Sequence, residues 1–351
     1  MSIARAALAV VLGASLSPAL VACGNGGVAT GRPKIAFVIA DDELNFASEM
    51  AAGFTAAANG AGGVDVTVIG PHTVDGPREV TMFQDQAAKA KGGISVETIS
   101  PELFARPLAA AAKDGIPLIA VDTAPAPGAG VKLYVGNDNY ELGTQLAAEA
   151  IKRLPATASG TVILGTTAPG VLPLDLRAQG MRDEFKKQLP QVRVQGTFNT
   201  SQEVAGNLAA WRRLVEANPD AIAFLGTGDA DAYSLAAIHR QTRATWLGGA
   251  FDLDPKSLQG VKDGDLFAVM SPEHYLKGAI AGRLQAEHAK AETDLPEGWI
   301  YTPGLVVTRG NIDQIVRRQA SAAAKSTWFA PGIAKILGGL KSSIRPLADA
   351  R

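Results

Sequence analysis

Acidic, amide and guanidinium side chains stand in this sequence close to short apolar runs that are typical of buried β-strands. Asp41 follows the run 35–40, Asp122 follows 116–121, and Asp252 follows a Gly-Gly-Ala-Phe segment. The carboxyl ends of parallel strands meet at one edge of a sheet, where open α/β sheets bind their ligands. The candidate binding residues are Asp41, Glu43, Phe46, Asp122, Asn137, Arg177, Asp229, Phe251, Asp252 and Glu273.

The chemistry of this set is hydrogen bonding to a small polar molecule. Carboxylate, amide and guanidinium groups are planar, so they exchange hydrogen bonds with hydroxyl groups in fixed directions. An aromatic face such as that of Phe46 covers the apolar C–H surface of a ring. Together these groups indicate a site for a small polar ligand.

Structural roles are an alternative for several of these residues. The loop 41–43 could be a solvated acidic turn before a helix that Asn45 caps. Asp122 or Asp229 could likewise cap a helix or hold a turn, and Arg177 could be an exposed helix arginine. The sequence alone leaves these alternatives open.

No arrangement of residues indicates an enzyme. The four histidines (His72, His239, His274 and His288) are far apart and do not match the His-Glu-x-x-His spacing of a zinc site. The sequence has no Gly-x-Ser-x-Gly segment for a hydrolase nucleophile and no Walker loop. The segment Gly226-Thr227-Gly228 begins like a dinucleotide-binding loop but lacks the third glycine. We therefore predict no catalytic residues, no metal and no cofactor.

Strand-like and helix-like segments alternate from residue 34 onward. The sequence reads as strand 35–40, helix 46–60 and strand 64–69, and this rhythm continues to 121 before it restarts at 132–135 and runs to 270. Such alternation predicts parallel sheets with helices on both faces. The predicted fold class is therefore α/β, with two doubly wound Rossmann-like lobes. The tail 321–351 has an apolar patch but no assignment.

Length and charge exclude other classes. A chain of 351 residues, 47% of them hydrophobic, is long enough for two buried cores. The formal net charge is −1 and aromatic residues make up 6% of the chain. Neither a basic field nor a stacking surface for nucleic acid is therefore expected.

The first 22 residues have the layout of a secretory signal peptide. Arg5 precedes an apolar run over 6–16, which is shorter than the roughly 20 residues of a membrane span. The following Leu20-Val21-Ala22-Cys23 resembles the bacterial lipobox, and Cys23 is the only cysteine. We predict a signal peptide over 1–22, lipidation of Cys23 and a flexible glycine-rich tether over 23–33. An ordinary signal peptide with an incidental cysteine is the alternative.

From about 34 to 320 the chain resembles the sugar-binding group of periplasmic-type solute-binding proteins, which includes ribose- and arabinose-binding proteins. The matching segments occur in the family's order: 35–46, 115–122, Gly136-Asn137-Asp138-Asn139, Arg177-Ala178-Gln179-Gly180, Gly249-Ala250-Phe251-Asp252, Tyr275-Leu276-Lys277-Gly278 and 305–311. The resemblance implies the type I periplasmic binding protein fold, in which a three-segment hinge joins two lobes. The first lobe would be 34–136 plus 272–302, and the second 137–271 plus 303–320.

The resemblance also implies roles for particular residues. Phe46 would stack on the ligand, Arg177 would donate to ring oxygen or hydroxyls, and Asp252 is the strongest binding candidate. Three positions depart from the family, which often has an arginine, a second aromatic residue and an asparagine where this chain has Thr123, Ala47 and Gly228. The resemblance therefore does not imply a named sugar.

The implied function is capture of a small polar ligand, a sugar or sugar alcohol, and its delivery to an ABC permease and its ATPase. The protein would be a monomer outside the cytoplasm, attached to the bacterial membrane only by its lipid anchor. A ligand sensor that presents its closed form to a chemoreceptor or kinase is the alternative. A LacI-type repressor would need a basic DNA-reading helix pair where this chain has its signal segment and tether.

Overall fold

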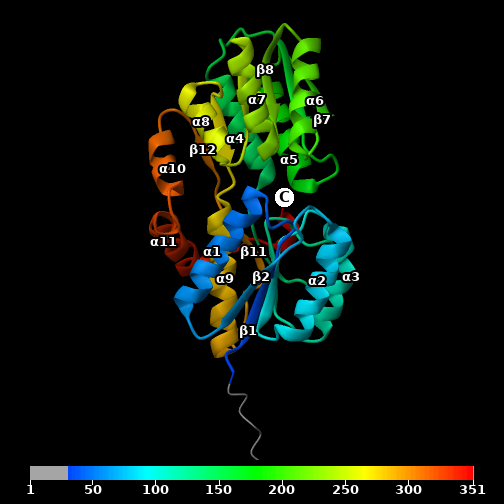
Figure 1. Cartoon of the computed structure of the whole chain (residues 1–351), viewed down its shortest axis with the longest axis vertical. Helices are drawn as coiled ribbons and strands as arrows, with labels where there is room; N and C mark the ends of the chain where they lie inside the picture. Colours follow the sequence, from blue (N-terminus) through cyan, green and yellow to red (C-terminus); the bar gives the residue numbers. More distant parts are fainter. Residues whose placement is uncertain (1–30, 351) are drawn as a thin grey trace, which may run out of the picture. The chain divides into compact units, whose positions relative to one another are not determined.

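The computed structural model describes residues 31–350, which fold around two six-stranded sheets (Figure 1). The strand order is β11-β5-β4-β3-β1-β2 in one sheet and β12-β10-β9-β8-β6-β7 in the other. Each sheet with the helices packed on it is referred to below as a lobe, the first lobe containing β1 and the second β6. The predicted signal peptide and most of the predicted tether, Cys23 included, lie outside the described residues.

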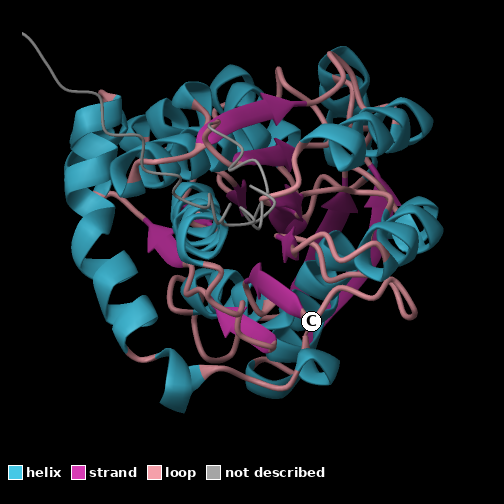
Figure 2. Ribbon diagram, turned by 90° about the horizontal axis from the view of Figure 1, so that it is seen from below, coloured by secondary structure: helices cyan, strands magenta, loops and turns pink. Residues whose placement is uncertain are grey.

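All strand pairs of the first lobe are parallel. Its β1, β3, β4 and β5 are short apolar segments that are buried almost throughout, as expected for strands covered on both faces. Figure 2 shows helices surrounding the strands. The elements are β1 (Lys34–Val38), α1 (Asn45–Ala61), β2 (Asp65–Ile69), α2 (Gly76–Lys89), β3 (Gly93–Val96), α3 (Pro101–Lys113), β4 (Leu118–Val121), β5 (Leu133–Gly136), α9 (His274–Ala291) and β11 (Gly298–Tyr301).

The second lobe repeats this arrangement, except that β12 pairs with β10 in antiparallel fashion. The sequence predicted a parallel sheet, and the short connection from β11 to β12 brings this last strand in from the opposite direction. The elements are α4 (Asn139–Ile151), β6 (Gly160–Thr166), α5 (Leu172–Gln188), β7 (Val192–Asn199), α6 (Val204–Ala217), β8 (Ala221–Gly226), α7 (Asp229–Thr242), β9 (Leu247–Phe251), α8 (Pro255–Asp263), β10 (Ala268–Ser271), β12 (Leu305–Val307) and α10 (Ile312–Gln319).

The chain passes between the two sheets in three short segments. These are 137–138 between β5 and α4, 272–273 between β10 and α9, and 302–304 between β11 and β12. The predicted fold class, two doubly wound α/β lobes whose sheets are joined by three segments, is therefore confirmed.

The C-terminal tail, which the sequence left unassigned, packs on the first lobe. It forms α11 (Ala322–Gly338), α12 (Leu340–Ser343) and a 3-10 turn (Leu347–Asp349). Phe329 of α11 is buried and stacks on Tyr275 of α9, with ring centroids 5.1 Å apart. Because α10 belongs to the core of the second lobe through Ile312 and Ile315, the link from α10 to α11 is a fourth passage between the lobes.

In each lobe, two helices pack closely along each other. Helix α1 packs along α9, and α4 packs along α5 (Figure 1). At Gly143 of α4, a Cβ atom would lie 2.0 Å from the backbone oxygen of Arg177 in α5. Only glycine permits this approach, and the contact fixes the helix that carries Arg177 against α4.

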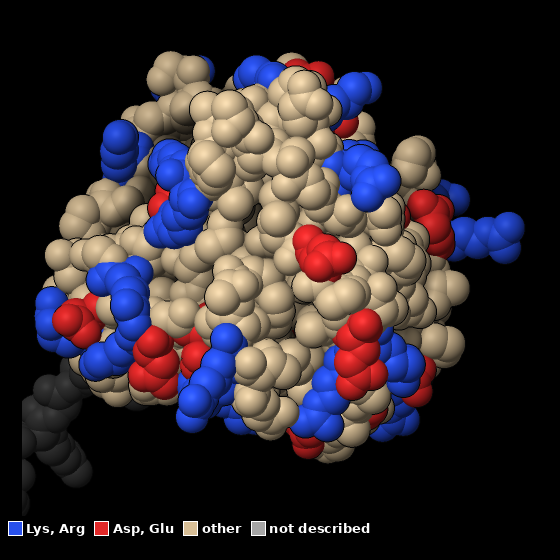
Figure 3. All heavy atoms as spheres, turned by 90° about the horizontal axis from the view of Figure 1, so that it is seen from above, with Lys and Arg blue, Asp and Glu red and all other residues tan. Residues whose placement is uncertain are grey.

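Among the helices of residues 31–350, none is long and apolar enough to cross a membrane. On the face shown in Figure 3, basic and acidic side chains are interspersed around an area of other residues.

Candidate functional site

A small cavity lies where the carboxyl ends of strands from both sheets face each other. Its volume is about 60 Å³, and residues of both lobes line it. Five of the predicted binding residues are among them: Phe46, Asp122, Arg177, Asp229 and Asp252. The topology thus brings together side chains that are up to 206 positions apart in the sequence (Phe46 to Asp252).

Asp122 and Asp252 occupy equivalent positions in the two lobes. Each directly follows the third strand in its sheet order, β4 or β9. Each backbone N–H donates to the neighbouring strand, from Asp122 to Val135 at 2.9 Å and from Asp252 to Met270 at 2.8 Å. Both residues have a left-handed backbone, with φ of 67° and 71°. Such backbones are uncommon outside glycine and concentrate at functional sites, which supports a role in binding for both acids.

A buried lysine balances the negative charge of Asp122. Lys277, whose exposed fraction is 0%, donates from Nζ to Asp122 Oδ1 and, over 2.8 Å, to Asn137 Oδ1. Burial alone would raise the pKa of Asp122, but the charges of Lys277, His274 and Arg177 outweigh it and hold this pKa well below its usual range. Burial lowers the pKa of Lys277, and the nearby Asp122 opposes that shift.

His274 connects the two acids across the lobes. Its Nε2 lies 2.8 Å from Asp252 Oδ1, and its Nδ1 lies 3.8 Å from Asp122 Oδ1. The ring is 8% exposed, lines the cavity and approaches the Phe46 ring, with centroids 5.7 Å apart. Its Nδ1 is buried without a hydrogen-bond partner in the described structure. Sequence reasoning missed both His274 and Lys277, although His274 directly follows the predicted second hinge segment.

Arg177 is held from three sides in the second lobe. Its Nε donates to Asn139 Oδ1 and one terminal nitrogen donates to Thr227 O, each over 3.0 Å. The guanidinium carbon lies 4.4 Å from the centre of the Phe251 ring, a cation–π geometry. Phe251 is therefore a support beneath Arg177 and does not line the cavity. A guanidinium has five N–H donors, so Arg177 keeps donors for a ligand.

Among the acids that line the cavity, Asp229 has the fewest groups nearby to stabilise its negative charge. It is the first residue of α7 and is partly buried, and its Oδ1 has no hydrogen-bond partner in the described structure. Burial, followed by the charges of Asp252, Asp254 and Asp231, raises the pKa of Asp229 well above its usual range. An unpaired buried carboxyl is costly, so a hydrogen-bonding ligand group here would be favourable.

The other predicted binding residues have partners within the protein. Asp41 Oδ1 accepts from the backbone N–H groups of Glu43 and Leu44, at 2.7 and 2.9 Å, and so forms a turn before α1. Asn137 Nδ2 donates to Thr302 O at 2.7 Å and joins two passages between the lobes. Glu273, with φ of 55°, is buried in an ion pair with Arg318 of α10. Of these three residues and Glu43, none lines the cavity, so ligand contact by them stays a prediction.

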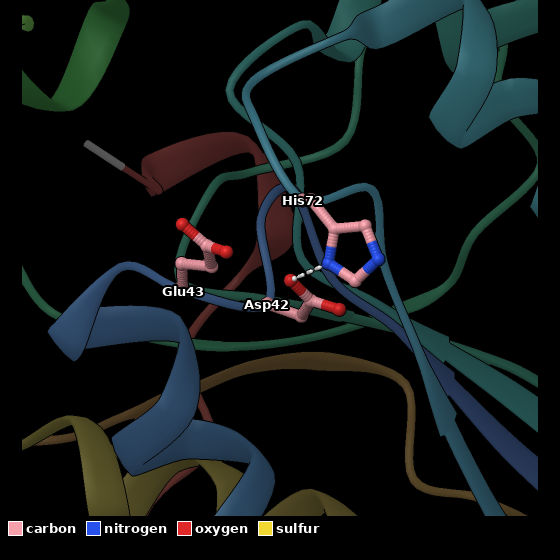
Figure 4. Close-up of side chains that lie close together, drawn as sticks. All are labelled: Asp42, Glu43 and His72. Carbon is pink, nitrogen blue, oxygen red and sulfur yellow. Dashed lines mark hydrogen bonds and ion pairs between the residues drawn. The ribbon is translucent and has the colours of Figure 1, made fainter.

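Beside the cavity, Asp42, Glu43 and His72 form an exposed surface cluster (Figure 4). Asp42 Oδ1 lies 2.9 Å from His72 Nδ1, and a carboxylate oxygen of Glu43 lies within 4.8 Å of both side chains without a drawn contact to either. Exposed groups of this kind commonly occur without a metal ion, and we assign the cluster no metal role.

Two glutamates of the first lobe are buried without lining the cavity. Glu97 directly follows β3, and its Oε2 accepts from the backbone N–H of Ala40 at 3.0 Å. Glu79 of α2 accepts from Thr98 Oγ1 at 2.9 Å and is 1% exposed. One oxygen of each carboxyl has no partner in the described structure. Burial raises the pKa of Glu79 to about 8 and the pKa of Glu97 well above its usual range, so both retain protons near neutral pH.

The sequence and the fold of this chain are similar to those of known binding proteins. Residues 35–293 match the family model described as periplasmic binding protein domain. One similar solved structure is an ABC transporter solute-binding protein from Burkholderia graminis in complex with D-arabinose (22% identity, TM-score 0.73, 80% of this chain and 96% of that one). Another is GanP, a glucose-galactose binding protein from Geobacillus stearothermophilus (22% identity, TM-score 0.72, 80% of this chain and 99% of that one).

A third similar structure is an ABC transporter solute-binding protein from Agrobacterium vitis with bound D-fucose (20% identity, TM-score 0.73, 80% of this chain and 97% of that one). At these identities the structural likeness shows the shared fold. No curated protein matches the chain.

We predict that Glu79→Gln stabilises the protein at pH 8 and has little effect at pH 5. As pH rises from the ordinary value of 4.5 toward about 8, the unfolded chain loses a proton that folded Glu79 keeps. The stability of the wild type must therefore fall over this interval. The amide cannot ionise, so the variant should gain on the order of 4 kcal/mol at pH 8, since each unit of pKa difference contributes about 1.4 kcal/mol.

Urea unfolding at pH 5 and pH 8 measures this difference. Glu216→Gln, which changes an exposed glutamate of α6, is the matched control and should follow the wild type. If Glu79→Gln loses as much stability between the two pH values as the wild type does, Glu79 is not protonated in the fold.

Proposed function

Since this chain belongs to the periplasmic binding protein domain family, we propose that it captures a small sugar or sugar alcohol between its two lobes for an ABC importer. The observation that carries the proposal is the pair Asp122 and Asp252. They come from equivalent positions in different lobes and line one cavity, where a single histidine lies between them, 2.8 Å from Asp252 and 3.8 Å from Asp122. A ligand with several hydroxyl groups can replace that histidine as the link between the lobes.

The groups around the cavity suit such a ligand. Asp122, Asp229 and Asp252 offer acceptors for hydroxyl protons, and Arg177 offers donors. Phe46 provides an apolar face for the C–H surface of a ring. Sugars bound to similar proteins (D-arabinose and D-fucose) agree with this chemistry.

Entry of a ring requires motion. The cavity of about 60 Å³ is far below the roughly 300–1,000 Å³ of ordinary ligand pockets. His274 must therefore leave its place between the acids, or the lobes must separate about the three passages, before a ligand enters. Closure around the ligand then gives the form that a permease recognises.

A ligand sensor is the second candidate function. The same closed form could be presented to a chemoreceptor or kinase instead of a permease, with an unchanged binding site. The family match favours either binding role over an enzyme. Genes for a permease and an ATPase beside the gene for this chain would decide for transport.

We predict that Asp252→Asn and Asp122→Asn each weaken ligand binding by about 10- to 150-fold. Each change removes a charged acceptor, and asparagine tolerates the left-handed backbone of both positions better than alanine does. The ligand is first identified by thermal shift with D-arabinose, D-fucose, D-allose, D-galactose and D-glucose. Isothermal titration calorimetry then measures the affinities after circular dichroism shows that the variants are folded.

Lys187→Ala, on the exposed side of α5, is the control and should bind like the wild type. If both aspartate variants bind within about threefold of the wild type, a loss of under roughly 0.7 kcal/mol, the site is elsewhere.

We also propose that Cys23 carries a lipid that attaches the protein to the outer side of the bacterial membrane. The proposal rests on the Leu20-Val21-Ala22-Cys23 segment after an apolar run, and on the family's extracytoplasmic location. Each buried methylene contributes about 0.8 kcal/mol, so two or more acyl chains anchor firmly.

Cys23→Ala should move the protein from the membrane fraction to the soluble fraction. The test is expression of both forms in a bacterial host that processes lipoproteins, followed by fractionation and detection of incorporated labelled palmitate. Equal membrane association of the two forms, without label in the wild type, would falsify lipid anchoring.

A further inference from the structure

A second, larger cavity lies next to the candidate binding cavity. Its volume is about 630 Å³, within the range of ordinary small-molecule sites. It shares three lining residues with the inner pocket: Ile99, Thr123 and Val171. The two cavities therefore adjoin at these residues, and they are called the inner and the outer part below.

The outer part differs sharply from the inner part in chemistry. Five ionisable side chains line the inner pocket, whereas Glu102 is the only charged residue on the outer wall. The loop 124–131 supplies much of that wall and consists of alanine, proline, glycine and valine. Leu103 of α3 faces it from the first lobe and Leu172 of α5 from the second.

Exposed apolar side chains concentrate at this site. Seven large hydrophobic residues of the described chain are exposed, and three of them line the inner or outer part: Val74, Leu103 and Leu172. Exposed apolar groups gathered around one concave surface indicate a binding site. Because this surface adjoins the polar pocket, a single ligand that reaches both would need a polar part and an apolar part.

We propose that the ligand is a glycoside, with its sugar ring in the inner pocket and an apolar substituent, aromatic or alkyl, in the outer part. The inference rests on the proposed sugar-binding function and defines the ligand class more narrowly. The hydroxyl groups of the ring meet Asp122, Asp252 and Arg177. The substituent meets the uncharged wall and gains affinity by leaving water.

Matched probes separate the two parts of the ligand. D-Glucose, D-galactose, D-fucose and L-arabinose are each titrated as the free sugar, the methyl glycoside and the 4-nitrophenyl glycoside. For at least one sugar the 4-nitrophenyl glycoside should bind at least about tenfold more tightly than the methyl glycoside, as expected when an aromatic ring is buried.

Leu172→Asp tests the outer wall, and Val204→Asp is its matched control. Both residues are the first of a helix, α5 or α6, and are 50% and 51% exposed. An aspartate at the first turn of a helix is favourable, so neither change should unfold the protein. Leu172→Asp should abolish the tenfold preference and leave the methyl glycoside affinity within about twofold, because an aspartate cannot contact an apolar ring without losing water. Val204→Asp should change neither affinity.

The outcomes distinguish this inference from the function on which it rests. Methyl glycosides or free sugars that bind as well as the 4-nitrophenyl glycosides overturn the glycoside proposal and leave sugar binding intact; the apolar wall would then fit a protein partner. Equal loss of both affinities in Leu172→Asp also overturns it. If no glycoside binds but a free sugar of either panel does, the glycoside proposal alone fails. If no sugar of either panel binds, sugar binding fails as well.

Discussion

The buried carboxylates of Asp122 and Asp252 set the main constraint on this structure. A carboxylate taken out of water needs positive charge or hydrogen bonds close by, or it gives up its charge. Lys277 meets that need for Asp122 and His274 for Asp252. Both partners come from the first two turns of α9, so one helix supplies a polar partner to an acid of each lobe.

This constraint connects the site to the passages between the lobes. Lys277 also holds Asn137, which in turn holds Thr302, so the first and third passages are bonded to the group that pairs with Asp122. The second passage contains Glu273, and its ion pair with Arg318 ties it to α10. A ligand that replaces His274 between the acids therefore acts on groups that are bonded directly to the hinge.

Much of this arrangement could be predicted because buried strands are recognisable in the sequence as apolar runs. Asp122 and Asp252 were found by their position directly after such runs, and the repeat of the alternation predicted two lobes. His274 and Lys277 were missed because they belong to a helix, where a lysine ordinarily points into solvent. The burial of Lys277 depends on packing between α9 and the first sheet, which no local pattern reveals. The same holds for Glu79, Glu97 and the packing of Phe329 on Tyr275.

The pairing of the two acids through one ligand is tested most directly by a crystal structure of the protein with a sugar or glycoside identified by titration. We expect one ring between the lobes, with hydroxyl oxygens within hydrogen-bonding distance, about 2.5–3.2 Å, of the carboxylates of both Asp122 and Asp252. His274 should no longer bridge the two acids. A ligand that contacts only one lobe, or that binds while the His274–Asp252 contact remains, would contradict this account.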